Sequence, residues 1–335
     1  LVTGVQTCAL PISIYFSNAF SAGVHTNNGI TASLYGFVPN FSHTTMSMPA
    51  RHYTGLPYFL HEYGYENICF VTSNPNYDNM NSFLRENGVD VIYSLYDYPS
   101  HAVVNNFGVP DDYMFSYGLE RLSEHKQPFC ATFVTVSNHI PYVIPVAYRS
   151  RGGSEEEQII AYSDDAVRAF MESAQATEWG RNTVFVIVAD HGSSSQELPY
   201  DMMLSFNSIP MYIVGADIEP RVVDYPASQV DIYPTVLSLL GLDYHNNSPG
   251  VDLLREHRRY AFFVSNDHLG CSDGEYLWCQ STSTNHRYLY RIGSTDNLID
   301  AEYERSAAME EYAKKMMSAN LHCMFNDLTS ADRSR

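Results

Sequence analysis

The chain has 335 residues, which is long enough for one large domain or two ordinary ones. Its 19 basic and 38 acidic residues give a formal net charge of −19, which repels polyanions and argues against a nucleic-acid partner. No run of roughly 18 or more consecutive apolar residues is present, so the sequence contains no predicted membrane span.

The first 13 residues resemble the translation of a sequencing adaptor, and no initiating Met precedes them. We therefore expect the native sequence to begin near Ile14, in the middle of a domain. Any first strand, signal or membrane anchor of the parent protein is then expected to lie upstream. The alternative is a genuine short N-terminal strand.

A polar, turn-rich stretch over residues 15–29 precedes a predicted short helix over 30–36. Thr26 is thus expected in the loop just before a helix N-terminus, a position that favours anions. A hydroxyl group there can serve as a nucleophile if it is activated. The alternative is that Thr26 only caps the helix.

Apolar strands and amphipathic helices then alternate along the chain, which predicts an α/β fold with a mostly parallel sheet covered on both faces. The predicted strands are 67–73, 89–95, 128–137, 183–189 and 209–215, and the predicted helices are 53–64, 77–88, 111–124, 155–179 and 229–241.

Two of these strands end in side chains suited to chemistry. The strand over 183–189 runs into Asp190-His191-Gly192, and the strand over 128–137 runs into Asn138-His139. Parallel sheets present ligand-binding groups at the carboxyl ends of their strands. Carboxylate and imidazole groups hold divalent metals, and a histidine can contact or protonate a substrate oxygen. The alternatives are a simple turn at Asp190 and a structural role for His139.

The C-terminal part has a different pattern. Antiparallel strands are predicted over 259–265, 275–280 and 286–292, with Gly270 and Gly274 in the connection between the first two, followed by an amphipathic helix over 301–320. Among the six Cys, no Cys-x-x-Cys spacing occurs. Cys271 and Cys279 flank a possible hairpin, and whether they pair stays open.

Five stretches together carry a family resemblance. They are His25-Thr26-Asn-Asn-Gly29, Thr135-Val-Ser-Asn138-His139-Ile-Pro-Tyr142, Tyr162-Ser-Asp-Asp-Ala166, Asn182 to Gly192, and Gln229-Val-Asp-Ile-Tyr-Pro-Thr235. In this order and spacing the sequence resembles the sulfatase-like branch of the alkaline phosphatase superfamily, and within it the lipoteichoic acid synthase-like group of phosphoglycerol transferases and hydrolases. The resemblance implies three parts: adaptor-like residues 1–13, an N-terminally truncated catalytic domain over 14–255, and an extension over 256–335.

The resemblance also implies roles for individual residues. The nucleophile of the family falls on Thr26, and the metal ligands fall on Thr26, Asp190 and His191. The substrate-contacting histidine falls on His139, and further substrate contacts are expected from His25, Asn138, Asp78 and Asn79. The implied cofactor is one divalent metal, with Mn²⁺ the first expectation and Mg²⁺, Ca²⁺ or Zn²⁺ the alternatives. The family also uses an acidic metal ligand on a strand upstream of the nucleophile, where this chain has only its adaptor-like residues, so the chain itself is expected to hold its metal weakly or to be inactive.

The implied activity is the metal-dependent transfer or hydrolysis of a phosphoryl-linked group, phosphoglycerol- or phosphoethanolamine-like, on a phospholipid or glycan of the bacterial cell envelope. The parent protein is then expected outside the cytoplasm and anchored in the membrane by helices upstream of this soluble fragment. One departure is Asn79, which stands where lipoteichoic acid synthases carry a phosphate-clamping Arg, while Ser73 and Asn74 stand at nearby histidine- and acid-type positions. This departure weakens the case for phosphatidylglycerol as substrate.

Two alternative functions remain. One is a sulfatase or phosphodiesterase that releases the group to water, although no Cys/Ser-x-Pro-x-Arg motif of true sulfatases surrounds Thr26. The other is a non-catalytic extracytoplasmic binding module with a degenerate metal site.

Overall fold

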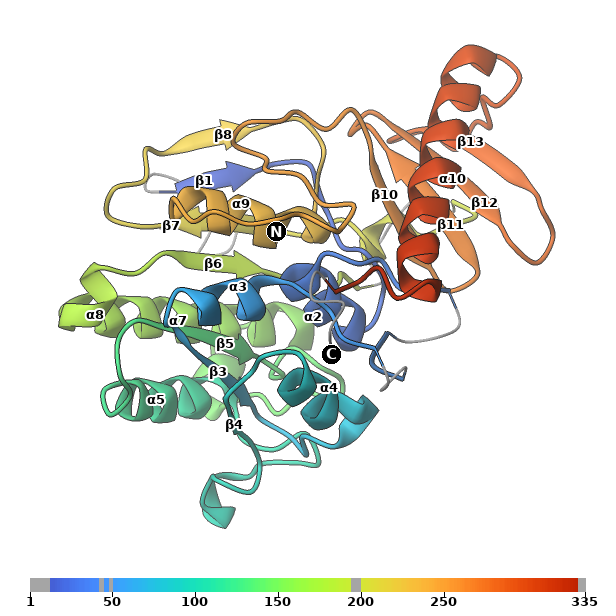
Figure 1. Cartoon of the computed structure of the whole chain (residues 1–335). Coiled ribbons are helices and arrows are strands. Elements are labelled where there is room, and N and C mark those ends of the chain that lie inside the picture. Colours follow the sequence, from blue (N-terminus) through green and yellow to red (C-terminus); the bar gives the residue numbers. More distant parts are fainter. Residues whose placement is uncertain (1–12, 42–44, 48–50, 194–199, 331–335) are drawn as a thin grey trace. The chain divides into compact units, whose positions relative to one another are not determined.

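The computed structural model describes residues 13–41, 45–47, 51–193 and 200–330. The chain forms two compact units. One contains residues up to 15, 60–186 and 213–221, and the other contains residues 16–59, 187–212 and 222–335. Four strands form one sheet, in the order β6-β7-β1-β8 (Figure 1). These strands are β1 (Ser13–Phe16), β6 (Phe185–Val188), β7 (Met211–Val214) and β8 (Arg221–Val223).

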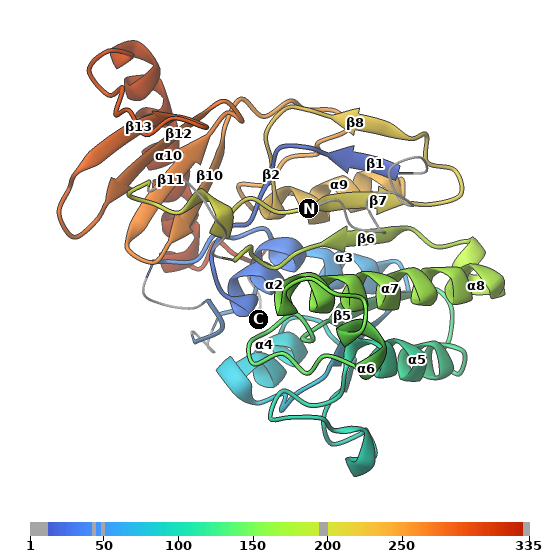
Figure 2. The ribbon, with the colours of Figure 1, turned by 180° about the vertical axis from the view of Figure 1, so that it is seen from behind.

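The first unit is built on a three-stranded parallel sheet. The strand order is β4-β3-β5, with β3 (Glu66–Val71) in the centre between β4 (Val91–Tyr93) and β5 (Phe129–Val134). The long helices α5 (Asp111–Leu122) and α7 (Glu155–Ala176) lie side by side against it (Figures 1 and 2).

Aromatic side chains join these layers. Phe70 of β3 stacks on Phe133 of β5 with ring centroids 4.5 Å apart, and Phe115 and Phe170 from the two helices pack on the same cluster. The N-terminus of α7 is fixed by a capping box between Ser154 and Glu157. The shorter elements in this part of the chain are α3 (Leu56–Glu62), η3 (Tyr77–Asn79), α4 (Met80–Glu86), η4 (Ser100–Ala102), α6 (Val146–Arg149) and α8 (Glu178–Arg181).

The second unit places helix α2 (Thr26–Tyr35) after a short strand, β2 (Ala19–Phe20). Strand β2 pairs in parallel with β9 (Ala227–Ser228), which continues into η6 (Gln229–Asp231) and α9 (Ile232–Leu239). Two short 3₁₀ helices, η2 (Thr45–Ser47) and η5 (Leu204–Phe206), complete this part.

An antiparallel sheet and a long helix end the second unit. The sheet order is β10-β11-β12-β13, with β10 (Ala261–Ser265), β11 (His268–Ser272), β12 (Tyr276–Ser281) and β13 (Arg287–Arg291). Helix α10 (Tyr303–Phe325) packs on one face of this sheet, where Met309 and Met317 contact a cluster that includes Trp278 and Leu289 (Figure 1). The opposite face packs against Phe20 and Met202.

Strand β11 was not predicted, because Gly270 was assigned to a turn. Gly270 instead lies within the strand, opposite Phe263, where an added Cβ atom would come within 2.4 Å of the Phe263 ring. The glycine is therefore required by close packing across the sheet rather than by a turn.

Cys271 and Cys279 are both free thiols in the structure. Cys271 lies opposite Trp278 and Cys279 lies opposite Gly270, so the two side chains point to opposite faces of the sheet. They contribute to different hydrophobic clusters, and burial raises the pKa of the Cys279 thiol to about 12. This register separates the two thiols and leaves each as a core residue.

The predicted fold class, a mostly parallel α/β sheet with a C-terminal antiparallel extension, is confirmed, and the extension has four strands instead of three. The sheet that contains the strand before Asp190 was expected to be covered on both faces. The residues of β6 are half-buried, because β6 is an edge strand of its four-stranded sheet. Among the described residues, no helix is both long and apolar enough to cross a membrane. Residues 1–13 were expected to be adaptor-like. Apart from Ser13, they lie outside the described residues.

Candidate active site

The centre of the candidate site is a contact between Thr26 and Asp190. The Thr26 hydroxyl donates a hydrogen bond of 2.7 Å to Oδ2 of Asp190. Thr26 is the first residue of α2, and Asp190 follows the end of β6 by two residues. Both residues belong to the second unit, and both are half-buried.

Helix α2 begins four residues earlier than predicted, at Thr26 instead of Ile30. Thr, Asn and Gly are weak helix formers, so the sequence pattern placed the start at the first apolar residue. In the structure the polar first turn is helical because it is packed, with Asn27 and Asn28 buried. His25 has the extended conformation of an N-cap residue and makes no side-chain capping bond. Thr26 therefore lies in the first helical turn, and not in the preceding loop.

Gly29 brings this helix close to the end of β6. A Cβ atom at position 29 would lie 2.7 Å from the Asp190 Cα atom and 2.8 Å from its carbonyl oxygen. Real contacts of this length do not occur, so only glycine permits the observed approach. The glycine thus sets the separation between Thr26 and Asp190.

The Asp190 and His191 side chains are oriented by their own backbone. Asp190 Oδ1 accepts a hydrogen bond of 2.9 Å from the His191 N–H, which turns Oδ2 toward Thr26. His191 Nδ1 lies 2.6 Å from the Gly192 carbonyl oxygen. A carbonyl can only accept, so Nδ1 carries the proton and the Nε2 atom of the neutral ring keeps its lone pair. Nε2 lies 3.6 Å from Asp190 Oδ2.

These three side chains fit a divalent metal. Ligands at about 2.1 Å from one ion lie roughly 3 Å apart, and the observed separations from Asp190 Oδ2 are 2.7 Å to Thr26 Oγ and 3.6 Å to His191 Nε2. The backbone bond at Nδ1 is the arrangement that metal-binding histidines use to present Nε2. Within the described residues no group of three His, Cys, Asp or Glu side chains is placed to hold a metal ion.

The predicted substrate residues Asn138 and His139 lie in the first unit, in an exposed turn that follows β5. His139 Nδ1 contacts the Ile140 carbonyl oxygen at 2.7 Å, and its ring packs against Phe107 with centroids 4.4 Å apart. The backbone just before the turn is held by Asp111. Asp111 Oδ1 accepts hydrogen bonds from the N–H groups of Val136 and Ser137, at 2.9 and 3.0 Å.

Asp78 and Asn79 also lie in the first unit, in η3 just before α4. Both have left-handed backbone conformations, with φ of 51° and 62°. Asp and Asn tolerate this region better than other non-glycine residues. The structure thus gives the two residues one sharp turn.

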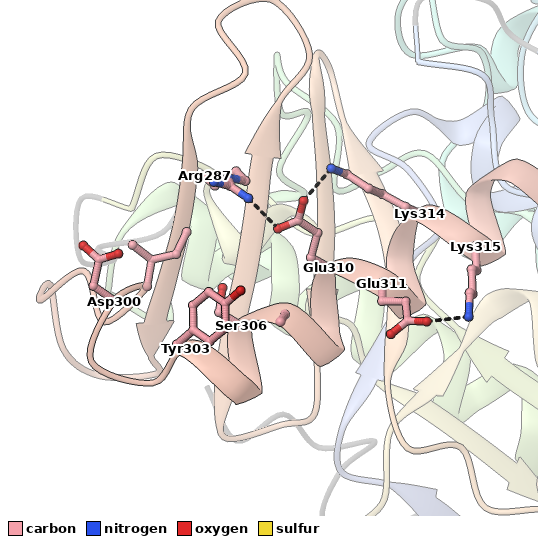
Figure 3. A pocket seen from close by; sticks show the side chains of 10 residues that line it. Arg287, Asp300, Tyr303, Ser306, Glu310, Glu311, Lys314 and Lys315 are labelled. Atoms are coloured by element: carbon pink, nitrogen blue, oxygen red, sulfur yellow. Dashed lines mark hydrogen bonds and ion pairs between the residues drawn. The ribbon is translucent and has the colours of Figure 1, made fainter.

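A separate hollow lies between β13 and α10, and Figure 3 shows its lining. Glu310 pairs with both Arg287, at 3.0 Å, and Lys314, at 2.5 Å, while Glu311 pairs with Lys315 at 2.5 Å. Its charged side chains neutralise one another instead of converging on a ligand, so it is a weaker candidate than the Thr26 site.

Sequence reasoning missed two residues that shape the site, Gly29 and Gln229. Each lies in a stretch that carries the family resemblance, but the pattern gave no structural role to either. The Gln229 side chain amide donates to the Ala189 and Asp190 carbonyl oxygens, both at 2.8 Å. Its position just after a short buried strand is the one signal in the sequence for a structural role of this polar residue.

Comparison with known proteins identifies the family of the chain. The sulfatase family model matches residues 12–242, which is more than half of the chain. Lipoteichoic acid synthase 2 of Bacillus subtilis (strain 168) is 24% identical over 255 residues, covering 69% of this chain and 38% of that protein. Phosphoglycerol transferase I of Xanthomonas euvesicatoria pv. vesicatoria is 24% identical over 299 residues, covering 83% of this chain and 42% of that protein. The chain thus spans about two fifths of the length of these curated relatives.

Solved structures show the same fold. A protein of the alkaline phosphatase superfamily from Vibrio parahaemolyticus superposes with a TM-score of 0.81 at 25% identity, over 99% of this chain and 83% of that one. The lipoteichoic acid synthase LtaP from Listeria monocytogenes superposes with a TM-score of 0.78 at 17% identity, over 95% of this chain and 86% of that one. The family match, supported by these neighbours, establishes that the chain belongs to the sulfatase family.

Proposed function

We propose that the chain is the catalytic part of a metal-dependent enzyme that transfers or hydrolyses a phosphoryl-linked group, phosphoglycerol- or phosphoethanolamine-like, with Thr26 as nucleophile. The observation that carries the proposal is the 2.7 Å hydrogen bond from the Thr26 hydroxyl to Asp190 Oδ2. A hydroxyl needs a proton acceptor or a bound metal to act as a nucleophile. A carboxylate such as Asp190 can accept the proton, and Asp190 and His191 are side chains of the kind that bind a metal.

In the proposed reaction, Thr26 Oγ forms a bond to phosphorus while the bond from phosphorus to the leaving alcohol oxygen breaks. Asp190 Oδ2 is placed to receive the hydroxyl proton. The leaving oxygen takes the bonding electron pair and gains a proton, for which His139 is the proposed donor. An acceptor alcohol or water then forms a bond to phosphorus while the bond from Thr26 Oγ to phosphorus breaks. The acceptor gives its proton to His139, and Thr26 Oγ takes back the proton held by Asp190.

Two features of the chain support an anionic substrate at this position. Thr26 is the first residue of helix α2, and backbone N–H groups at a helix N-terminus stabilise phosphate charge. Thr26, Asp190 and His191 would hold the metal, for which we propose Mn²⁺, and a bound divalent metal would favour the ionised hydroxyl and polarise the phosphoryl oxygen.

The proposed substrate is a lipid or glycan of the bacterial cell envelope. This proposal draws on the names of the relatives, a lipoteichoic acid synthase and a phosphoglycerol transferase. It places the parent protein outside the cytoplasm and anchored in the membrane. The proposed substrate contacts from His25, Asn138, Asp78 and Asn79 belong to the same hypothesis.

The test is turnover of three probes by the chain with its parent's upstream residues restored, each with Mn²⁺ or with chelator. The probes are a head-group-labelled glycerophospholipid, bis(4-nitrophenyl) phosphate and 4-nitrophenyl sulfate. We expect metal-dependent cleavage of the two phosphodiesters, and its loss in Thr26→Ala. Preference for the sulfate would favour a sulfatase, and product analysis with an added alcohol separates transfer from hydrolysis. Metal binding without turnover of any probe would favour a binding module.

A further inference from the structure

The side chain of Gln229 joins three distant segments of the second unit. Its Nε2 group donates to the Ala189 and Asp190 carbonyl oxygens, each at 2.8 Å, and its Oε1 atom accepts from the Ala22 N–H at 2.8 Å. Gln229 is fully buried. One amide thus links the end of β6, which carries Asp190, to the segment that leads from β2 to Thr26.

We propose that Gln229 is a positioning residue, which holds the Asp190 carboxylate opposite the Thr26 hydroxyl. The inference rests on the proposed function of that pair. The three hydrogen bonds of the Gln229 side chain go to backbone atoms of Ala22, Ala189 and Asp190, so it acts on the site through the Asp190 backbone.

The chemistry of the contacts requires an amide. Both amide hydrogens are donated and the amide oxygen accepts, so each side of the side chain has a defined partner. A carboxylate at this position could accept from Ala22 but could not donate to the two carbonyl oxygens. It would also bring a negative charge against those oxygens in a buried setting, which is unfavourable.

Gln229 is itself held in place by its neighbours in the chain. Ser228 pairs with Phe20 between β9 and β2. Two residues after Gln229, the buried Asp231 accepts from the Ser228 N–H and the Val251 N–H, both at 2.9 Å, and pairs with Arg258. These bonds hold the backbone at Gln229 in place, so the Gln229 amide can in turn hold the Asp190 backbone in place.

Asn320 offers a matched control in the same unit. It is also fully buried, and its amide accepts from the Val38 N–H at 2.9 Å and donates to the Val38 carbonyl oxygen at 2.8 Å. Val38 lies beyond the C-terminal end of α2, away from Thr26 in the chain. Asn320→Asp therefore removes a buried amide donor as Gln229→Glu does, without touching the β6 end.

The experiment compares Gln229→Glu with Asn320→Asp by amide hydrogen exchange of the 335-residue chain without metal. It also compares them, in the chain with its parent's upstream residues restored, by turnover of bis(4-nitrophenyl) phosphate with Mn²⁺. Both variants should lower the thermal midpoint. Only Gln229→Glu should speed exchange in a peptide spanning 187–193, by about tenfold or more, and lower kcat by about tenfold or more with KM little changed. Gln229→Met, which removes all three hydrogen bonds at similar length, should show the same pattern and replaces the first variant if that one does not fold.

The proposal is overturned if exchange over 187–193 rises no more in the Gln229 variants than in Asn320→Asp. It is also overturned if exchange rises there while kcat stays at the wild-type value. If the wild-type chain itself has no turnover, the proposed function fails on this probe, and the exchange comparison still decides whether Gln229 holds the Asp190 segment.

Discussion

Thr26 and Asp190 are separated by 164 positions in the chain, yet the Thr26 hydroxyl donates a hydrogen bond of 2.7 Å to Asp190 Oδ2. Two other residues make this contact possible. Gly29 permits the close approach of α2, and Gln229 holds the Asp190 backbone. The contact between Thr26 and Asp190 therefore depends on how α2 packs against the end of β6. Changes in that packing should change the reactivity of the Thr26 hydroxyl.

The first prediction concerns Gly29. Gly29→Ala places a methyl group 2.7 Å from the Asp190 Cα atom, so α2 and the end of β6 must separate. We expect a loss of about 1–3 kcal/mol in the free energy of unfolding, as for other overpacked cores, together with a large fall in kcat. Urea unfolding and turnover of a phosphodiester measure the two effects.

The control is Gly118→Ala in α5, where the added methyl group meets the Phe133 ring at 2.4 Å. This change should also lower stability, but leave kcat near the wild-type value. A Gly29→Ala variant with normal turnover would show that the contact with Asp190 does not depend on this glycine.

A second prediction concerns Asp111 and pH. Burial raises the pKa of its carboxyl group above the ordinary range, and the hydrogen bonds from Val136 and Ser137 only partly oppose this. A raised folded-state pKa means that folding favours the protonated form, so this contribution to stability is present at low pH and is lost as pH rises through the folded-state pKa. Asp111→Asn keeps an acceptor oxygen but cannot ionise.

The stability of Asp111→Asn relative to wild type should therefore increase as pH rises from about 4 to 7, which urea unfolding at several pH values can measure. Asp111→Ala should be less stable than both, because two N–H groups before the His139 turn lose their acceptor. A difference between Asp111→Asn and wild type that does not change with pH would contradict the raised pKa.

The third prediction concerns the buried ion pair of Asp231 and Arg258, whose side chains are 0% and 3% exposed. Arg258 Nε lies 2.9 Å from Asp231 Oδ2. Arg258→Met leaves a buried carboxylate without its cation and should cost about 3–5 kcal/mol in chemical unfolding. The exposed pair of Arg291 and Glu275 is the control, and Arg291→Met should cost less than about 1 kcal/mol. An equal loss in the free energy of unfolding for the two variants would show that the buried pair contributes no more to stability than the exposed pair.

The sequence was sufficient for the alternation of strands and helices, and for the position of Asp190 and His191 just after a strand. Asp190 and His191 stand out because a carboxylate and an imidazole follow a run of apolar residues. The start of α2 was placed four residues late, because tertiary packing, and not local propensity, makes Thr26 to Gly29 helical. Strand β11 was missed because Gly270 serves a contact across the sheet that its neighbours in the chain do not reveal. Gln229 could not be assigned, because its partners lie 40 and 207 positions away.

The most direct test of the account is to identify the residue that carries the transferred group. The chain with its parent's upstream residues restored is mixed with bis(4-nitrophenyl) phosphate and Mn²⁺, quenched with acid, digested and analysed by mass spectrometry. Thr31→Ala is the control, since Thr31 lies on the same helix and its hydroxyl donates within that helix, to the Asn27 carbonyl oxygen at 2.7 Å. We predict an aryl phosphate on the peptide containing Thr26 in the wild type and in Thr31→Ala, and its absence, with loss of turnover, in Thr26→Ala. Turnover that persists in Thr26→Ala, or an aryl phosphate on a different residue, would contradict the account.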